Sequence, residues 1–433
     1  MKRIYNIWLI SAVLTLVAVS CGDGVSLPDI PCETDLYKIP LPEEESKLLI
    51  PLKDNSTPMI HNGGLLFSYD DYEYVKQHLD RSPWKEGYKV LCDNYHSNLG
   101  YRPSPQSALD RNSNGGNFMK ACHDVAAAYQ HALRYHLGDG EAYAEEALTI
   151  LSSWVNTCEA MAGDSHAALS SGLYGYEFAV AGEMMRDYWI SKDADGFKRF
   201  QEWMLKIFYP TQHTFLEGGW ESVQGHYWAN WGLANVAGAV CLGIVCDRRD
   251  IYNEGIEHFQ IGCTNGNINR AINHVFSGEW SNVAQWQESG RDTGHVLLCQ
   301  GLTGVICQAT WGQGDDFFGY DDCRFLKGCE YHGAYYTAKK DVPFEPYIRN
   351  SQGPWGPVSD LITKICDRGD ATGASNIWAI PYNHYAKIKN LEPERTQYTK
   401  MGMEISIPEG GGDGGVSGGY DMLGHGTLMF TRE

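Results

Sequence analysis

The sequence predicts an all-α protein whose helices form an incomplete α/α toroid, followed by a small C-terminal β-hairpin. Apolar residues recur at helical spacing from residue 68 to about residue 389, strand signals are nearly absent before residue 400, and no fixed repeat period is visible. A long row of antiparallel helix pairs needs a shared core, and without a repeat period its closure into a toroid is favoured over an open solenoid. With 433 residues, 43% of them hydrophobic, the chain can bury such a core.

Residues 1–20 are predicted to be a lipoprotein-type signal peptide. Lys2 and Arg3 precede an apolar run, from Ile7 to Val19, that is too short to span a membrane comfortably. The run ends in Ala18-Val19-Ser20-Cys21, which resembles a bacterial lipobox, where cleavage leaves a diacylated Cys21. An ordinary cleaved signal peptide is the alternative. We expect an exported protein, lipid-anchored at the outer membrane on its periplasmic or cell-surface side.

Residues 21–57 are rich in proline and charge and are predicted to be a tether, which leaves 58–433 for the toroid domain. Ser68 is expected to cap a first helix through Leu79, and a second helix follows Pro83. Further helices are expected at 118–137, 143–155, 168–190, 193–208, 227–246, 250–262, 291–311, 323–338, 357–367 and 375–389. Residues 404–407 and 427–431 alternate like two short strands around a glycine-rich loop.

Charge and cysteine usage exclude several classes of function. The net charge of −20 argues against nucleic acid as a partner, because phosphate binding needs clustered lysine and arginine. No second apolar stretch reaches membrane-spanning length, so the lipid is the one expected membrane contact. The cysteines beyond Cys21 form no metal-binding pattern, so we expect mostly free buried thiols, at most one surface disulfide, no metal and no cofactor.

Two clusters of polar residues interrupt the apolar helices. In the first, His226 and Asn230 are four residues apart and would share a helix face among Tyr227, Trp228 and Trp231. A buried polar pair of this kind needs partners, and a satisfied core pair is the alternative to a binding site.

In the second cluster, Gln287, Arg291 and His295 are spaced so that one helix start would project all three, with Glu288 or Asp292 orienting His295. A charge cluster that tightens a helix entry is the alternative. A third stretch, Tyr382-Asn383-His384-Tyr385, is less specific.

Other titratable residues give weaker indications. Glu177, Glu183, Glu288 and Asp292 include possible carboxylate pairs for a glycoside hydrolase, although nothing in their spacing specifies one. His166 and His213 stand alone in the sequence, and solvated or core positions are expected for them.

At these residues the sequence resembles the alginate lyase superfamily of polysaccharide lyases, especially alginate lyase domain proteins of polysaccharide-degrading Bacteroidetes. The resemblance covers most of residues 58–431 in order. The matching segments are His61-Asn62-Gly63-Gly64-Leu65, Gly175-Tyr176-Glu177 with Glu183 and Arg186, Tyr227-Trp228-Ala229-Asn230-Trp231, residues 287–295, Gly319-Tyr320-Asp321-Asp322 and Tyr382-Asn383-His384-Tyr385. It implies an α/α toroid and β-elimination on a uronate polysaccharide, alginate or glucuronan-like.

The chemistry explains the residue types. Elimination removes the C5 proton beside a carboxylate and expels the O4 glycosyl group, which requires that the carboxylate charge be neutralised by an amide, His or Arg. A Tyr or His then accepts the C5 proton, and a Tyr commonly donates a proton to O4. The resemblance implies that Asn230 is the neutraliser, that His226 is a neutraliser or base, and that Arg291 and His295 form the facing side.

Two departures from the family pattern leave the catalytic tyrosine open. Better-known members carry an Asn-His pair before the Tyr-Trp, where this chain has Gln224-Gly225-His226, and a Tyr after the Arg, where this chain has Val296-Leu297-Leu298. Tyr227, Tyr174 and Tyr382 are the candidates. The residues expected to bind substrate are Trp231, Gln287, Glu288, Tyr174, Tyr382 and His384.

Three functions therefore remain open on the sequence alone. The first is a lyase, the second a glycoside hydrolase on the same toroid, and the third a non-catalytic glycan-binding surface lipoprotein. In each case the expected partner is an anionic polysaccharide or oligosaccharide, and the expected state is a monomer. The particular uronate polysaccharide and the endo or exo mode stay undetermined.

Overall fold

The computed structural model describes residues 48–219, 226–349, 361–411 and 420–433. The predicted signal peptide, the lipidation residue Cys21, most of the tether and Gln224-Gly225 lie outside the described residues. Residues 48–57, the end of the predicted tether, do contact the domain: the Ile50 amide donates to Gln260 Oε1 at 2.7 Å, and Lys53 pairs with Asp315 at 2.9 Å.

Helices occupy most of the described chain, as predicted. In chain order they are α3 (Tyr69–Lys76), α4 (Trp84–Asp93), α5 (Phe118–His136), α6 (Glu141–Thr157), α7 (His166–Met184), α8 (Arg186–Ile207), α9 (Tyr209–Leu216), α10 (Ala229–Val245), α11 (Arg249–Ile261), α12 (Ile268–Ala271), α13 (Thr293–Gly312), α14 (Tyr320–His332), α15 (Ala379–Asn383), α16 (Gln397–Ser406) and α17 (Gly426–Phe430). Single π-helical turns extend α14 and α15.

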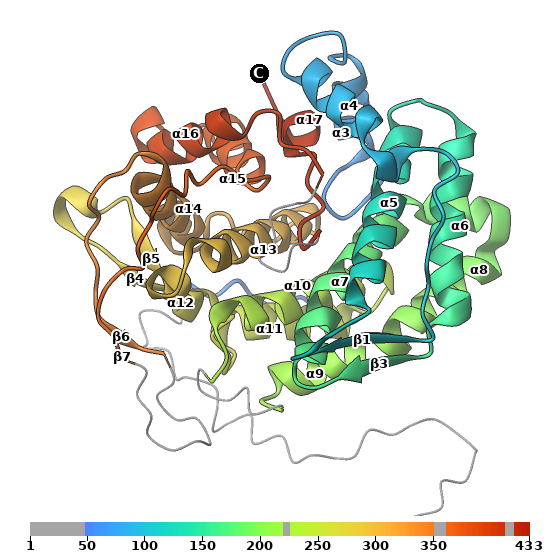
Figure 1. Cartoon of the computed structure of the whole chain (residues 1–433), viewed down its shortest axis with the longest axis horizontal. Helices are drawn as coiled ribbons and strands as arrows, with labels where there is room; N and C mark the ends of the chain where they lie inside the picture. Colours follow the sequence, from blue (N-terminus) through green and yellow to red (C-terminus); the bar gives the residue numbers. More distant parts are fainter. Residues whose placement is uncertain (1–47, 220–225, 350–360, 412–419) are drawn as a thin grey trace, which may run out of the picture. The chain divides into compact units, whose positions relative to one another are not determined.

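The helices are arranged in pairs with an inner and an outer member, which is the toroid predicted from the sequence. The inner helices α5, α7, α10 and α13 contact one another in that order, and α6, α8, α11 and α14 each follow and contact their inner partner (Figure 1). Burial agrees with this assignment, because α7 and α10 are buried over almost every residue whereas α6 and α8 keep an exposed face. The fold is therefore an incomplete α/α toroid.

Small residues let the inner helices approach closely. A Cβ on Gly172 of α7 would lie 2.5 Å from the Ala234 backbone of α10, and a Cβ on Gly238 of α10 would lie 2.4 Å from the Gln212 side chain. The N-terminal ends of α7 and α10 also lie close together, since the ring of His166 is 5.3 Å from that of Trp231.

Short strands are more frequent than the sequence suggested. They are β1 (Ala108–Asn112), β2 (Gly115–Gly116), β3 (Ala160–Gly163), β4 (Ile272–Val275), β5 (Ala284–Trp286), β6 (Tyr347–Ile348) and β7 (Leu361–Ile362), paired as β2-β1-β3, β4-β5 and β6-β7. Strands of two to five residues are too short for alternation to show in the sequence. Parallel β1 and β3 lie just before the inner helices α5 and α7 and tie their entries together.

The predicted C-terminal hairpin is wrong. Residues 404–406 end helix α16, and 426–430 form helix α17. The alternation was misleading because Ile405 and Ile407 are exposed instead of facing a core, while every residue of α17 is buried. The helix expected over 357–367 is also wrong in its described part, because 361–362 pair as β7.

Other local predictions are confirmed. Ser68 caps α3 in a reciprocal capping box with Asp71, and α4 starts directly after Pro83. None of the eleven described cysteines forms a disulfide with another described cysteine, and nine of them are buried. None of the described helices is both long and apolar enough to cross a membrane.

A buried glutamate joins the C-terminal segment to α15. Glu409 Oε1 accepts hydrogen bonds from the backbone amides of Trp378 and Ala379 at 3.0 and 2.8 Å, and Thr427 Oγ1 accepts from the Glu409 amide. Burial raises the pKa of Glu409 to about 8. The folded protein therefore holds a proton on this side chain at pH values where the unfolded chain has lost it.

As the pH rises from about 4.5 to 8, we expect the free energy of unfolding of the wild type to decrease relative to that of Glu409→Gln. A carboxyl whose folded-state pKa is raised stabilises the fold below its unfolded pKa, and that contribution is lost as the pH rises through the folded value. The Gln side chain keeps the acceptor oxygen and does not titrate, so the difference should reach a few kcal/mol, on the order of 2–4. Denaturant unfolding of both proteins across this range is the measurement, and parallel stability curves would contradict it.

Candidate active site

The two polar clusters predicted from the sequence meet at the N-terminal ends of α10 and α13. The backbone amide of Ala229 donates to Gln287 Oε1 at 3.1 Å, and that of Asn230 donates to Glu288 Oε1 at 3.1 Å. The entry of α13 thus satisfies the unpaired amides at the start of α10. Segments 58 residues apart in the sequence form one site.

The helical geometry expected for each cluster differs from the observed one. His226 precedes α10, which starts after its N-cap Trp228, so His226 and Asn230 do not share a helix face. Gln287–Gly290 form a 3₁₀ turn and Asp292 is the N-cap of α13, so Gln287 and Arg291 precede the helix that carries His295. The caps decide both cases, because extended residues at Trp228 and Asp292 interrupt the helical run.

A buried amide and carboxyl form the floor of the site. Asn230 Nδ2 donates to Glu288 Oε1 at 2.6 Å, and both residues are almost completely buried. Burial raises the pKa of Glu288 above its ordinary value, while the guanidinium of Arg291, with Nη1 3.4 Å from Glu288 Oε2, acts in the opposite direction. Asn230 therefore holds Glu288, which in turn positions Arg291.

Positive charge is concentrated around one indole ring. The guanidinium carbons of Arg291 and Arg349 lie 5.1 and 4.8 Å from the centre of the Trp228 ring, within the range of cation–π contacts. Arg349 also donates to the backbone oxygen of His226. In a chain of net charge −20, these two arginines are the cations that an anionic ligand would meet here, and Glu288 and Asp292, at 3.4 and 3.7 Å, partly offset the charge of Arg291.

His295 is held in one orientation by Asp292. Its Nδ1 lies 2.7 Å from Asp292 Oδ2, and Asp292 Oδ1 caps the helix by accepting from the His295 amide at 2.9 Å. Partial burial alone would raise the pKa of Asp292, but the hydrogen bonds from His295 and the charge of Arg291 lower it overall. Among the described residues, His295 Nε2 has no hydrogen-bond partner. With Nδ1 donating to Asp292, the neutral imidazole presents Nε2 as an acceptor.

Aromatic rings line the neighbouring side. Tyr227 stacks on Trp231 with ring centres 4.6 Å apart, and Phe215 of α9 contacts both rings, at 5.4 and 6.3 Å. His226 packs edge-on against Tyr227. The structure therefore brings together most of the predicted site: His226, Tyr227, Asn230, Trp231, Gln287, Glu288, Arg291 and His295.

The other predicted residues lie elsewhere. Tyr174 is completely buried in the core, stacks on Phe118, and burial raises the pKa of its hydroxyl far above its ordinary value. Tyr382 is a half-buried residue of α15. His384 contacts Trp311 in the last turn of α13, which lies about 24 Å from His295 along this helix at 1.5 Å per residue.

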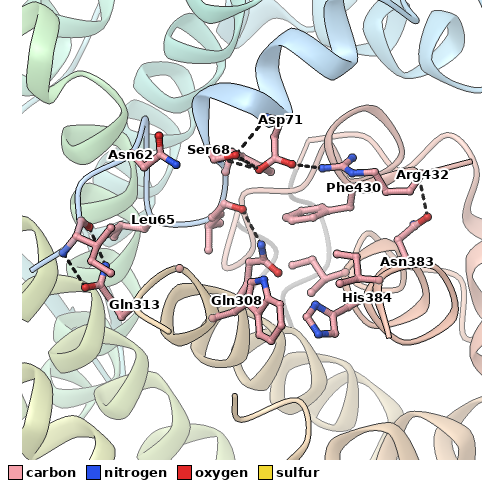
Figure 2. Close-up of a pocket in the computed structure, with 18 residues that line it drawn as sticks. Asn62, Leu65, Ser68, Asp71, Gln308, Gln313, Asn383, His384, Phe430 and Arg432 are labelled. Atoms are coloured by element: carbon pink, nitrogen blue, oxygen red, sulfur yellow. Dashed lines mark hydrogen bonds and ion pairs between the residues drawn. The ribbon is translucent and has the colours of Figure 1, made fainter. Parts of the chain in front are cut away.

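His384 lines a separate cavity of about 300 Å³ between the segment before α3 and helices α13, α15 and α17 (Figure 2). Several polar groups of this cavity fasten the chain: Gln313 exchanges hydrogen bonds with Ile60 at 2.8 and 2.9 Å, Gln308 donates to the Leu66 oxygen, and Arg432 pairs with Asp71. Burial lowers the pKa of His384 to about 3, and its ring stacks on Phe318. We interpret these contacts as structural: they hold the segment before α3 and the C-terminal residues against α13.

The four carboxyl groups considered for a glycoside hydrolase do not form an accessible pair in the candidate site. Glu177 is completely buried, and this burial, with a smaller contribution from the nearby Asp421, raises the pKa of its carboxyl well above the ordinary value. Glu183 is buried and bound by His61 at 2.6 Å and by Arg186 at 2.8 Å. Glu288 and Asp292 flank Arg291, but Glu288 is enclosed by Asn230.

The sequence analysis did not identify Arg349 as a site residue, nor Trp228 as the ring that both arginines contact. Arg349 follows strand β6, 58 residues after Arg291, and no local pattern links it to the site. Trp228 was noted only as one of three aromatics, although its position at the start of α10 makes it reachable from both arginines.

The fold and the site define an α/α-toroid protein with a histidine, arginine and carboxylate site at the N-terminal ends of its inner helices. A family model described as alginate lyase matches residues 79–271, which confirms the resemblance seen in the sequence. No curated protein matches the sequence.

Solved alginate lyase structures share this fold. Alginate lyase A1-III from Sphingomonas species A1 is 13% identical, with a TM-score of 0.54 over 87% of this chain and 98% of that chain. A variant of it complexed with a tetrasaccharide is 11% identical, with a TM-score of 0.57 over 87% and 97%. An alginate lyase from Bacteroides ovatus is 13% identical, with a TM-score of 0.51 over 86% and 100%.

Replacing Asn230 by alanine is expected to lower both stability and activity. The change leaves the buried Glu288 carboxyl without its 2.6 Å donor, which should cost about 1–3 kcal/mol of stability and release Arg291 from its position. Asn235→Ala is the matched control, because Asn235 is a buried amide on the same helix that bonds the Trp231 oxygen. Melting temperature and kcat/KM should both fall in Asn230→Ala, whereas Asn235→Ala should lose stability alone. Equal kcat/KM in the two variants would contradict the prediction.

Proposed function

We propose that this protein is a polysaccharide lyase that cleaves a uronic-acid-containing polysaccharide, alginate or glucuronan-like, by β-elimination. The observation that carries the proposal is the Asp292–His295 pair beside Arg291. Asp292 fixes the tautomer of His295, so that Nε2 is the accepting nitrogen. The neighbouring Arg291 side chain keeps 29% of its surface accessible.

Each step of the elimination has a group at the site. Arg291 forms a charge-assisted hydrogen bond to the uronate carboxylate, which makes the C5 proton acidic. His295 Nε2 accepts that proton, while Asp292 stabilises the imidazolium that forms. The electron pair of the C5–H bond becomes the C4=C5 double bond, and the C4–O4 bond breaks. Tyr227 is the proposed proton donor to the departing O4, since Tyr174 and Tyr382 lie elsewhere.

Electrostatics support an anionic substrate. The N-terminal ends of α7, α10 and α13 carry the positive ends of their dipoles, and Arg291 and Arg349 lie there as well, with the charge of Arg291 partly offset by Glu288 and Asp292. The likeness to structures that bind a tetrasaccharide supports an oligosaccharide or polysaccharide as partner. The stacked rings of Tyr227 and Trp231 provide a flat apolar surface of the kind that sugar rings pack on.

Incubation with a panel of uronate polysaccharides tests the proposal. Alginate, glucuronan, glycosaminoglycan and pectic chains are each followed by the ultraviolet absorbance of the C4=C5 double bond and by reducing ends. A lyase produces both signals together. Reducing ends without absorbance would establish a hydrolase, and binding with neither signal would establish a non-catalytic glycan-binding protein.

We also propose that the protein is exported and anchored by a lipid on Cys21. The motif at residues 18–21 supports this location. Cys21→Ser is expected to move the protein from the membrane fraction to the soluble fraction or to leave an uncleaved precursor. Normal processing together with unchanged membrane retention would contradict the lipid anchor.

A further inference from the structure

A second group of histidines and carboxylates lies outside the candidate active site, between α9 and α11. His213 and Glu217 are four residues apart at the end of α9, and Glu254 and His258 are four residues apart on α11. Residues with this spacing lie on one helix face. Each helix therefore presents one imidazole and one carboxylate to the other.

The side-chain atoms of this cluster lie within reach of a single ion. One ligand atom each of His213, Glu217 and Glu254 lies within 4.8 Å of the others. His213 Nδ1 is 2.6 Å from Glu254 Oε1, and His258 Nε2 is 3.1 Å from Glu217 Oε1. In tetrahedral coordination with bonds of about 2.0–2.2 Å, ligand atoms are roughly 3.5 Å apart. Small side-chain rotations would bring these atoms to that separation.

We propose that His213, Glu217 and Glu254 bind a divalent transition-metal ion of the zinc type, with His258 as a fourth ligand or as the partner that orients Glu217. Two carboxylates balance the charge of the ion, and imidazole nitrogen favours zinc-type ions over calcium or magnesium, which prefer oxygen ligands alone. Binding of the ion at this site can be tested independently of the proposed lyase activity.

Supporting contacts around the cluster fit a metal site. Tyr209 donates to Glu254 Oε2 at 2.7 Å, which leaves Oε1 directed at His213. Outer contacts of this kind orient metal ligands and raise affinity. The four side chains keep between 9% and 37% of their surface exposed, so an ion can enter from solvent.

The ion would fix α9 relative to α11 next to the candidate active site. Phe215, between His213 and Glu217 on α9, contacts the rings of Tyr227 and Trp231. A metal at this point would therefore steady the aromatic side of the active site without touching substrate. That is a positioning role, not a catalytic one.

Zinc titration of the intact protein tests the site. The protein is dialysed against a chelator, and the heat of binding of zinc chloride is measured for wild type, His213→Gln and Glu254→Gln. His166→Gln is the matched control, since His166 forms a similar 2.7 Å pair with one carboxylate, Asp164, but belongs to no such cluster of three ligands among the described residues. We expect one tight site in wild type and in His166→Gln, and binding at least about 100-fold weaker in the other two variants.

Two further measurements on the wild type avoid dependence on the variants. Zinc at 100 times its Kd should raise the melting temperature by about 2 °C or more, whereas calcium and magnesium should not. Cobalt should give the visible absorption of a tetrahedral nitrogen and oxygen site. If wild type binds zinc no more tightly than His213→Gln, or gives no such spectrum, the cluster consists of histidine–glutamate ion pairs only and the proposal is wrong. Neither result depends on any polysaccharide being cleaved.

Discussion

Replacing His295 by alanine is expected to lower kcat/KM on the true substrate by about two to four orders of magnitude, the usual contribution of a general base. The Nδ1 atom of His295 is hydrogen-bonded to Asp292, which orients the ring. The Nε2 atom has no hydrogen-bond partner among the described residues and is the acceptor nitrogen. Its side chain is only 18% exposed, so some packing is lost together with the bond to Asp292, and we expect this to cost about 1 kcal/mol of stability, against two or more orders of magnitude in rate. The melting temperature should therefore change much less than the rate.

Asp292→Asn separates the role in catalysis from the role in helix capping. Asparagine caps a helix nearly as well as aspartate, so α13 should keep its start. It cannot stabilise the imidazolium by charge, so kcat/KM should fall by about tenfold or more. A rate equal to that of wild type in both His295→Ala and Asp292→Asn would remove this pair from the mechanism.

Replacing Arg291 by lysine is expected to lower kcat/KM by about ten- to a hundredfold, which corresponds to one charge-assisted contact of roughly 1.5–3 kcal/mol. Lysine keeps the charge near Glu288 but cannot form the bidentate fork on a carboxylate. Arg199→Lys is the control, because Arg199 is an exposed arginine paired with Asp193 on α8. Kinetics and melting temperatures are measured together for both variants.

The two interpretations of Arg291 give opposite results. If it binds the uronate carboxylate, kcat/KM falls while the melting temperature stays near that of Arg199→Lys. If it only ties the entry of α13 to Glu288, the melting temperature falls and the folded fraction keeps its kcat/KM. The second outcome would contradict the assigned role.

The helical part of the fold was predictable because it depends on local patterns. Helix pairs such as α5 and α6, with the turn at Gly138–Gly140 between them, follow from apolar spacing and glycine alone. The short strands and the helices α16 and α17 were not predictable from the sequence, because their conformation depends on packing against distant segments. Ile405 and Ile407, for example, alternate like strand residues and yet are exposed.

Most members of the candidate site were predictable from the sequence, although Arg349 was not, and the geometry of the site was not predictable. The sequence marked Asn230, Glu288, Arg291 and His295, but their contacts depend on the caps at Trp228 and Asp292. His213 was expected to stand alone, although Glu217 four residues later was a usable signal. Its main partner, Glu254, lies 41 residues away and could be found only from the packing of α9 against α11.

The most direct test of the proposed elimination follows the C5 hydrogen of the substrate. A polysaccharide cleaved in the panel is prepared with deuterium at C5 and digested in water enriched in heavy oxygen, and the products are analysed by mass spectrometry. β-Elimination predicts that the residue at each new non-reducing end has lost its C5 deuterium and that no heavy oxygen is incorporated. Products that keep the deuterium and gain one heavy oxygen at each cleavage would contradict the lyase mechanism.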